Sequence, residues 1–438
     1  MLNLKPFVVS AFTENEHDYH VMAVTGVEVK LCINCQSNDI YRFGKREQLI
    51  KDLPMHAKRV GIYVDTKRYR CKSCSKTFFE RLPGVDEKRH MTDRLIAWIG
   101  KSSIKRTFSS IANEVGITEG TVRLIFKDYV KKLENRIKFD TPSYMDIDEI
   151  HIIKKPRGVI TNIESNTIVE LLVNRNKVTV IQYLSSLPSK EKIKCVAMDM
   201  WEPYKDAVQQ VMPSAVIVID KFHVVRMASV ALEIVRKAHR ASLSAPARRR
   251  LIRDRFILLK RPWELSSEER LKLSEWIENF PELGLGYSLK ESFYEIYDSS
   301  DKYEALDRYQ AWELSVPPHM RDAFAPLIKA WRNWQPYILN YFEHKITNAY
   351  TESLNNLIRV ANRNGRGYSF DVLRAKMLFA EGAIKKELIK PKFERQQHGK
   401  GLPEEVFAMY GLSNDADNYI NLGVDIATLA ALIENDEI

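Results

Sequence analysis

The pattern of apolar positions between residues 144 and 219 changes repeatedly from the period of a strand to that of a helix. The segment "YMDIDEIHII" alternates polar and apolar residues as a half-buried strand does, whereas "TVIQYLSSL" has its apolar residues at helical spacing. The elements predicted in this way are strands at 144–153, 158–164 and 166–174, a helix at 179–187, a strand at 192–198, a helix at 202–212 and a strand at 215–219.

Three strands, a helix, a strand, a helix and a strand follow in the order of a ribonuclease-H-like fold. In that fold the first strand of the mixed sheet is central, the fourth pairs beside it and the fifth lies beyond the fourth. Asp148 in the first strand and Asp199 at the end of the fourth can therefore share metal ions, whereas Asp220 follows the fifth strand and lies further out. Asp146 points to the same face as Asp148 by alternation, so the pattern alone leaves it as an alternative.

A third carboxylate must come from a later helix that crosses the same sheet, and the candidate stretch is "HKITNAYTESLNNLIRVANRNGRGY". On a helix, one face of this stretch carries Asn348, Glu352, Asn355 and Arg359. Leu354 and Ile358 form its apolar side. Such carboxylates can hold two metal ions about 3.5 to 4 Å apart, and ligands that are all oxygen select Mg²⁺ or Mn²⁺. The sequence therefore predicts a two-ion magnesium or manganese site.

The front of the chain carries four of its five cysteines in two close pairs, "CINC" and "CKSC". Two residues between thiolates let one tight turn present both sulfurs to one ion, and two such turns complete a tetrahedral zinc site. The predicted ligands are Cys32, Cys35, Cys71 and Cys74. Four thiolates leave no open position for a substrate, so we expect one structural zinc ion, with four unligated thiols as the alternative. Residues 59–70 are expected to form strands that carry the second pair back to the first.

Charge is distributed unevenly along the chain. The formal net charge is +10 and the sequence pI is about 9.1, which favours a polyanionic partner such as nucleic acid. No Lys or Arg follows Lys400. Basic residues crowd the second cysteine pair, and they are Lys67, Arg68, Arg70, Lys72 and Lys76. They could contact phosphates, and a solvated basic face is the alternative.

The next segment, "TFSSIANEVGITEGTVRLIFKDYVKKL", has the pattern of a helix-turn-helix. Ile111 and Val115 belong to an apolar stripe at helical spacing, and Gly116 can end that helix in a left-handed conformation. Thr118 can cap the next helix, which buries Val122 and its neighbours. The second helix would lie in the major groove. The DNA contacts that we predict are Arg106, Thr118, Glu119, Thr121, Arg123 and Lys127. A three-helix packing module without DNA contact is the alternative.

Residues 224–343 have helical spacings and hold five of the seven tryptophans, which predicts an all-helical insertion into the sheet domain. Trp331 or Trp334 could stack on a flipped base, but such tryptophans are more often part of a core. The acidic tail is either a small packed appendage, which we favour, or a segment that masks a basic channel or mediates dimer contacts. No run of about 18 apolar residues exists to span a bilayer, the start has no secretory signal pattern, and paired cysteines suit a reducing compartment. We therefore expect a cytoplasmic, nucleoid-associated protein.

Six stretches of the chain together resemble one known family, the bacterial insertion-sequence DDE transposases of the ISL-three group. They are "RYRCKSCSKTFFERLP", "IDE" around Asp148, "MDMWEPY" around Asp199, "VIDKFHVVR" around Asp220 and His223, "RFILLK" from Arg255, and "TESLNNLIRVANRNGRGY" around Glu352. The resemblance spans nearly the whole chain. It implies a catalytic triad of Asp148, Asp199 and Glu352, in agreement with the choice made from the fold.

The resemblance also implies the reaction and the partners. Such enzymes hydrolyse the phosphodiester at a transposon end and then use the freed 3′ hydroxyl to attack target DNA. The partners would be double-stranded DNA, as terminal inverted repeats and target, and at least a second copy of the chain, since two ends must be paired. The motif "DKFH" places Asp220 and His223 in a second shell around the metal site, with Asn348 and Asn355.

The expected fold class is multidomain, with α+β and α/β parts. Its domains are a four-cysteine zinc module (1–85), a helix-turn-helix (86–140), the first part of a ribonuclease-H-like core (141–223), the all-helical insertion (224–343), the second part of the core (344–395) and the acidic tail (396–438). Two alternative functions remain open: a nuclease of the same fold without strand transfer, and a DNA-binding regulator with an inactive core. Retention of all three acids argues against the regulator.

Overall fold

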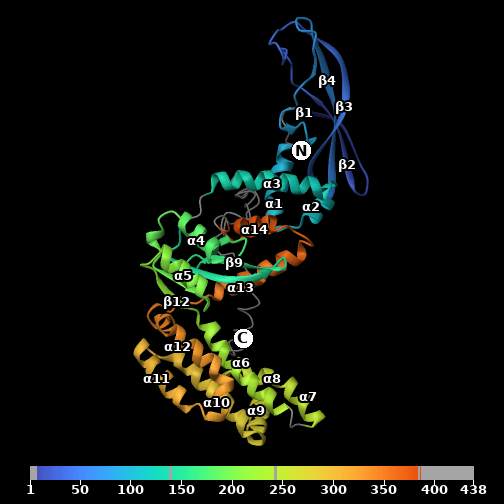
Figure 1. The fold of residues 1–438 in the computed structure, drawn as a ribbon. Coiled ribbons are helices and arrows are strands. Elements are labelled where there is room, and N and C mark those ends of the chain that lie inside the picture. Colours follow the sequence, from blue (N-terminus) through green and yellow to red (C-terminus); the bar gives the residue numbers. More distant parts are fainter. Residues whose placement is uncertain (1–6, 138–140, 241–243, 383–384, 386–438) are drawn as a thin grey trace, which may run out of the picture. The chain divides into compact units, whose positions relative to one another are not determined.

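The computed structural model describes residues 7–137, 141–240, 244–382 and 385 (Figure 1). The acidic tail at 396–438 lies outside the described residues. None of the described helices is long and apolar enough to cross a membrane.

The first part of the chain forms a seven-stranded sheet around a long hairpin. Its strands are β1 (Phe7–Glu14), β2 (Asp18–Thr25), β3 (Ile40–Met55), β4 (Lys58–Cys71), β5 (Thr77–Phe79), β6 (Val85–Asp86) and β7 (Met91–Thr92). They pair in the order β1-β2-β4-β3-β7-β6, and β5 pairs with β4. The predicted strand at 59–70 is confirmed as β4, which returns Cys71 to the position opposite Ile40.

Three helices follow, namely α1 (Asp93–Lys105), α2 (Phe108–Val115) and α3 (Glu119–Arg136). Gly116 ends α2 with φ 70° and ψ 45°, a left-handed conformation that glycine adopts without steric cost, and a Cβ there would lie 2.7 Å from Arg59 Cδ. Thr118 caps α3 by accepting a hydrogen bond from the Thr121 N–H. Val122, Ile125 and Phe126 are buried, so the predicted helix boundary, cap and apolar face are confirmed.

The second sheet has the predicted strand order. Its elements are β8 (Tyr144–Ile152), β9 (Lys155–Asn162), β10 (Thr167–Leu171), α4 (Lys177–Ser186), β11 (Cys195–Met198), α5 (Glu202–Val211) and β12 (Val216–Ile219). The strands lie in the order β10-β9-β8-β11-β12. β9 is antiparallel to β8, whereas β11 is parallel to both β8 and β12. The first strand is therefore central and the fourth pairs beside it, as the fold analogy requires.

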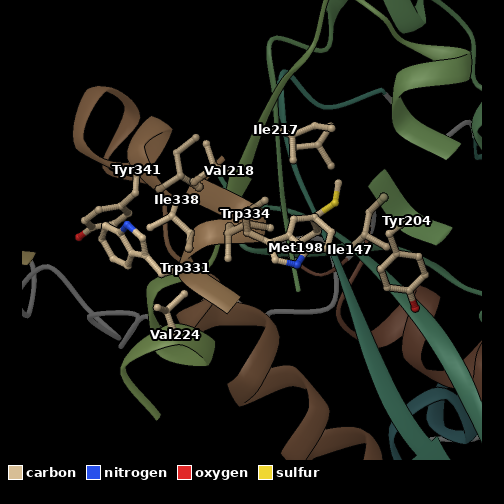
Figure 2. Packing of buried hydrophobic residues seen from close by; sticks show 14 of the residues in the cluster. Ile147, Met198, Tyr204, Ile217, Val218, Val224, Trp331, Trp334, Ile338 and Tyr341 are labelled. Carbon is tan, nitrogen blue, oxygen red and sulfur yellow. The ribbon is translucent and has the colours of Figure 1, made fainter. Parts of the chain in front are cut away.

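The insertion is helical throughout its described length. Its α-helices are α6 (Lys221–Arg240), α7 (Ala245–Arg253), α8 (Arg255–Leu259), α9 (Ser267–Asn279), α10 (Pro281–Glu295), α11 (Lys302–Ser315) and α12 (Arg321–His344). The last of them packs on β12, where Asn340 Nδ2 donates to the carbonyl of Ile217 at 2.7 Å. Trp331 and Trp334 are buried in the same cluster as Met198 and Val218 (Figure 2), so the expectation that these tryptophans belong to the core is confirmed.

Two more helices, α13 (Ala349–Asn364) and α14 (Phe370–Ala380), return to the sheet. Leu354 and Ile358 are fully buried, as predicted for the apolar side of α13. This helix contacts β8, the strand that carries Asp148, and α14 contacts β10 and α1. The chain after the insertion thus supplies a helix to the strand where the candidate site lies.

Candidate functional site

Asp148 and Asp199 meet at the point where β8 and β11 run side by side. Met198, the last residue of β11, pairs with Ile147 of β8, so the next residue on each strand is one of the two aspartates. Their carboxylates and the ring of His223 offer ligand atoms that all lie within 4.8 Å of one another. The structure therefore brings together two of the three predicted acids.

His223 contacts Asp199 directly, with 2.6 Å between its Nε2 and Asp199 Oδ1. Burial opposes the charged imidazolium, but the contact with Asp199 outweighs it and raises the pKa of His223 to about 8. The sequence places His223 behind the metal ligands, and a ring that holds Asp199 fits that role. The same ring nitrogen is also positioned to ligate a cation.

Asp220 has a different role from Asp199 in this structure. Its carboxylate is fully buried at the start of α6, where it accepts hydrogen bonds from the N–H groups of Phe222 at 3.0 Å and of Asn348 at 3.3 Å. Burial raises the pKa of Asp220 to about 6. Asp220 is not in the ligand cluster, and its two hydrogen bonds tie the first residues of α6 to the residue before α13.

Asp148 is held by groups from two elements. Asn355 Nδ2 on α13 donates to its Oδ2 at 2.7 Å, and the Glu149 N–H donates to its Oδ1 at 2.6 Å. Burial and the nearby charge of Asp199 raise the pKa of Asp148 to about 7, while His223 and Asn355 act in the opposite direction. Two carboxylates that repel each other in a buried setting form a site that a cation would stabilise.

Asp146, the alternative to Asp148, lies deeper and outside the ligand cluster. It pairs across the sheet with Thr161, whose hydroxyl lies 2.8 Å from that of Thr351 on α13. Burial, followed by the charge of Asp148, raises the pKa of Asp146 well above its usual range. The geometry therefore favours Asp148 as the ligand, and Thr351 is a buried contact that the sequence pattern did not reveal.

Glu352 is exposed on α13 and is not part of the ligand cluster. It lies three residues before Asn355, so the two side chains leave the helix on neighbouring faces. Asn348 is buried, with its Nδ2 3.5 Å from His223 Nε2, whereas Arg359 is exposed and bonds to Asn356. The predicted polar stripe thus divides into buried and exposed residues. That Glu352 is the third metal ligand stays a prediction.

Divalent cations fit the residues at this site. Asp148 and Asp199 supply the hard oxygen ligands that Mg²⁺ and Mn²⁺ prefer. The side-chain oxygens of Asn348 and Asn355 are buried and accept no hydrogen bond from any described residue. Such unpaired oxygens beside two carboxylates match a cation with its water shell.

Sequence reasoning missed an arginine and a tryptophan beside the site. The Arg175 guanidinium lies 4.4 Å from the centre of the Trp201 ring, and it forms an ion pair with Glu149. Trp201 follows Asp199 by two residues and is 38% exposed. The only signal in the sequence is the position of "MW" after the aspartate.

The four predicted zinc ligands also come together. Sγ atoms lie 3.7 Å apart for Cys32 and Cys74 and 3.6 Å apart for Cys35 and Cys71, and all four lie within 4.8 Å of one another. Tetrahedral zinc with bonds of about 2.3 Å requires sulfurs about 3.8 Å apart, so this cluster fits the ion. Burial disfavours the Cys32 thiolate, but the N–H groups of Asn34 and Cys35 outweigh it and lower the pKa of Cys32 to about 6. A thiolate is the form that binds zinc.

The predicted DNA contacts lie at the start of α3 and around α2. Arg123 Nη2 donates to Glu119 Oε1 at 2.6 Å, and the hydroxyls of Thr118 and Thr121 are 2.9 Å apart. Arg106 pairs with Glu114, and Lys127 is exposed. These residues stay predicted contacts.

Family profiles match three separate parts of the chain. The transposase profile of the ISL3 group matches residues 145–377, more than half of the 438 residues. The chain belongs to the ISL3 family of transposases. A zinc-finger profile of the transposases IS204/IS1001/IS1096/IS1165 matches residues 28–74, and the helix-turn-helix profile of transposase family ISL3 matches residues 80–130. The expected family and fold class are confirmed, and this transposase is an enzyme that acts on DNA.

Curated relatives of this transposase have similar descriptions. The transposase for insertion sequence element IS1001 of Bordetella parapertussis is 23% identical over 348 residues, which cover 78% of this chain and 86% of the relative. The transposase for insertion sequence element IS1557 of Mycobacterium tuberculosis is 24% identical over 308 residues, which cover 63% of this chain and 68% of the relative.

Proposed function

We propose that this transposase binds the terminal inverted repeats of an insertion sequence, cleaves the phosphodiester at the element ends and joins the 3′ hydroxyl ends to target DNA. The observation that carries the proposal is the pair of aspartates on adjacent strands, Asp148 and Asp199, with α13 lying against β8. Two carboxylates at this position of a ribonuclease-H-like sheet support phosphodiester chemistry.

Asp148, Asp199 and Glu352 would hold the metal ions. Two divalent cations bound there activate the attacking oxygen and stabilise the leaving oxygen. Asn355 fixes the orientation of the Asp148 carboxylate through its 2.7 Å hydrogen bond, and His223 does the same for Asp199. Glu352 would reach the cluster when DNA and metal are bound. Its helix, α13, already contacts β8, and the Glu352 side chain is exposed at the surface, where it can change its orientation.

The other parts of the chain would serve DNA binding and assembly. The start of α3 would read the inverted repeats in the major groove, and one zinc ion at the four cysteines would stabilise the module that precedes it. A homodimer or larger assembly would pair the two ends. The domain boundaries given above are part of the proposal.

Two other functions would also be compatible with these observations. A nuclease of the same fold would cut without joining strands, and a regulator would bind DNA over an inactive core. The adjacent aspartates, one buried and one half-buried, favour an active core, because two like charges held this close are costly to keep without a cation. Joining of DNA strands is the step that separates a transposase from a nuclease.

The deciding experiment gives purified protein Mg²⁺ and a labelled duplex that carries the element ends, and follows cleavage and strand joining on sequencing gels. We expect both products from the wild type and at least a 100-fold loss of both in Asp199→Asn. Asp206→Asn is the control, since Asp206 lies half-buried on α5, outside the candidate ligand cluster, and pairs with Lys177. Full activity of Asp199→Asn would refute the site, and cleavage without joining would identify a nuclease.

A further inference from the structure

A row of arginines and aromatic rings lies on one face of the sheet formed by β3, β4 and β5. The Arg46 guanidinium lies 4.0 Å from the centre of the Phe79 ring. Arg68 lies 5.6 Å from Phe43 and 5.7 Å from Phe79, and Arg70 lies 5.5 Å from Phe43. The three cations thus share two rings in a continuous row.

The strand registers place these residues on the same face. Arg68 pairs with Phe79 across β4 and β5, and Arg68 and Arg70 are two apart on β4, so their side chains point the same way. A register shift between Arg42 and Gly44 turns Phe43 toward them. Tyr41 continues the row, with its ring centre 6.1 Å from that of Phe43 in an edge-on arrangement.

The arginine–aromatic face comprises Tyr41, Phe43, Arg46, Arg68, Arg70 and Phe79, of which the first three are exposed and the last three are half-buried. Phe43 is 44% exposed and Tyr41 is 38% exposed. Within the described residues, none of its three guanidiniums forms an ion pair with a carboxylate. Nearby basic residues differ, because Lys45 pairs with Asp65 and Lys72 pairs with Asp39. The face therefore carries three positive charges that lie against rings, and Arg68 Nη2 also donates to Thr77 Oγ1 at 3.0 Å.

Stacked guanidiniums suit a particular partner. A ring orients the planar fork and excludes water from one side, which leaves the outward N–H groups free to bind phosphate oxygens. An acidic protein surface would match the charge, but exposed rings beside the cations can also lie against sugars or bases, which favours DNA.

We propose that the arginine–aromatic face binds the DNA backbone at the element end, as a second DNA-contact surface in addition to the helix-turn-helix. This inference rests on the proposed function, because it takes the bound DNA to be the end of the element. It assigns to this sheet a contact that does not depend on base sequence, since phosphates carry no sequence information directly.

The test measures fluorescence anisotropy of a labelled element-end duplex, without metal ions, at a series of salt concentrations. The variant Arg46→Ala/Arg68→Ala/Arg70→Ala removes the three charges. We expect its affinity to fall at least 10-fold at about 0.1 M salt, and the salt slope to fall by about 2 to 3, because each phosphate contact contributes about 0.9. The same decrease should occur on a duplex of scrambled sequence.

Lys45→Ala is the matched control, since it removes one charge from the same strand, at the residue before Arg46, where the charge is already paired with Asp65. We expect less than a 2-fold effect from it. Phe43→Ala leaves every charge in place but removes a ring from beneath two arginines. It should weaken binding by 3-fold or more with little change of slope.

An unchanged slope and affinity in the triple variant, with zinc content and circular dichroism as in the wild type, would overturn the proposal. Binding of the triple variant to polyglutamate, a mimic of an acidic protein surface, is a second readout. If the variant lost this binding but kept its affinity for DNA, the proposal would also be overturned, and the partner of the face would be an acidic protein. Failure of the proposed function would be seen separately, as absence of Mg²⁺-dependent cleavage by the wild type. A protein that binds DNA through this face but does not cut would keep the inference and refute the function.

Discussion

At the scale of single residues, the candidate site is a balance between repulsion and orientation. Asp148 is buried beside the charge of Asp199, which is why the pKa of Asp148 rises to about 7. His223 and Asn355 lower the cost by holding one carboxylate each. These groups therefore keep the two aspartates in place for a cation that neutralises them.

Asn355→Ala tests this balance. Loss of the amide removes the hydrogen bond that favours ionised Asp148, so we expect the affinity for Mn²⁺ to fall about 10-fold to 100-fold, as loss of groups that orient metal ligands usually does. Titration calorimetry with Mn²⁺ at pH 7.5 measures it. Asn356→Ala is the control, because Asn356 is the next residue on α13 and faces solvent. Equal Mn²⁺ affinity in Asn355→Ala and the wild type would show that Asn355 does not support the site.

At the scale of elements, α14 contributes one unusual side chain to the end of α1. Lys376 is buried, and its Nζ donates to the carbonyl oxygens of Ser103 and, at 2.8 Å, Arg106. The rings of Phe108, Phe126 and Tyr368 surround it within about 5 Å. Burial lowers the pKa of Lys376 to about 7, and a neutral amine can still donate to the two carbonyls.

The lowered pKa predicts a pH dependence of stability. Between pH 7 and the ordinary lysine pKa of 10.5, the unfolded chain binds a proton at Lys376 that the folded chain does not. Folding stability should therefore increase with pH over this window, by about 1.4 kcal/mol per pH unit at most, and this increase is absent below pH 7. Lys376→Met removes the titration, so the wild type should gain stability relative to the variant from pH 7 to 9.

Urea unfolding at several pH values measures this difference. Lys105→Met serves as control, since Lys105 is exposed in the last turn of α1 and its removal should shift stability equally at each pH. Parallel pH profiles of the wild type and Lys376→Met would contradict the prediction.

Most helices and strands could be predicted where the periodicity of apolar residues in the sequence was strong. The strands from β8 to β12 have apolar runs bounded by polar residues, and their order alone placed Asp148 beside Asp199. By contrast, β1 buries only its first residue, Phe7, so its sequence has no inside–outside alternation to detect. The helical period also predicted the two faces of α13.

The contacts within the site were harder to predict, because they depend on how helices are rotated against the sheet. His223 reaches Asp199 from α6, which begins over twenty residues after the end of β11 in the chain. On α13, one polar stripe divided into Asn355, which faces Asp148, and Glu352, which faces solvent. Among the basic residues near the zinc site, Lys67 and Lys72 likewise form ion pairs, whereas Arg68 and Arg70 belong to the arginine–aromatic face.

At the scale of the whole molecule, the two candidate metal sites would serve different tasks in the same chain. The cysteine cluster joins the loop that contains Cys32 to the end of β4, whereas the aspartate pair lies in the second sheet. One site has only sulfur ligands and the other has mainly oxygen ligands, so each selects its own metal. Loss of one metal should therefore leave the other site intact.

Cys74→Ser tests this independence. With three thiolates left, the zinc content measured by mass spectrometry should fall from about one ion per chain to well below one half.

Without zinc, the link from the Cys32 loop to β4 is lost. DNA affinity should therefore decrease, because the arginine–aromatic face includes Arg70, which precedes Cys71. Mn²⁺ binding at Asp148 and Asp199 should remain within 2-fold of the wild type. Ser73→Ala is the control, since Ser73 lies between Cys71 and Cys74 in the chain and its hydroxyl is 2.8 Å from that of Ser37. Full zinc content in Cys74→Ser would refute the four-cysteine site, and joint loss of Mn²⁺ binding would show that the two sites depend on each other.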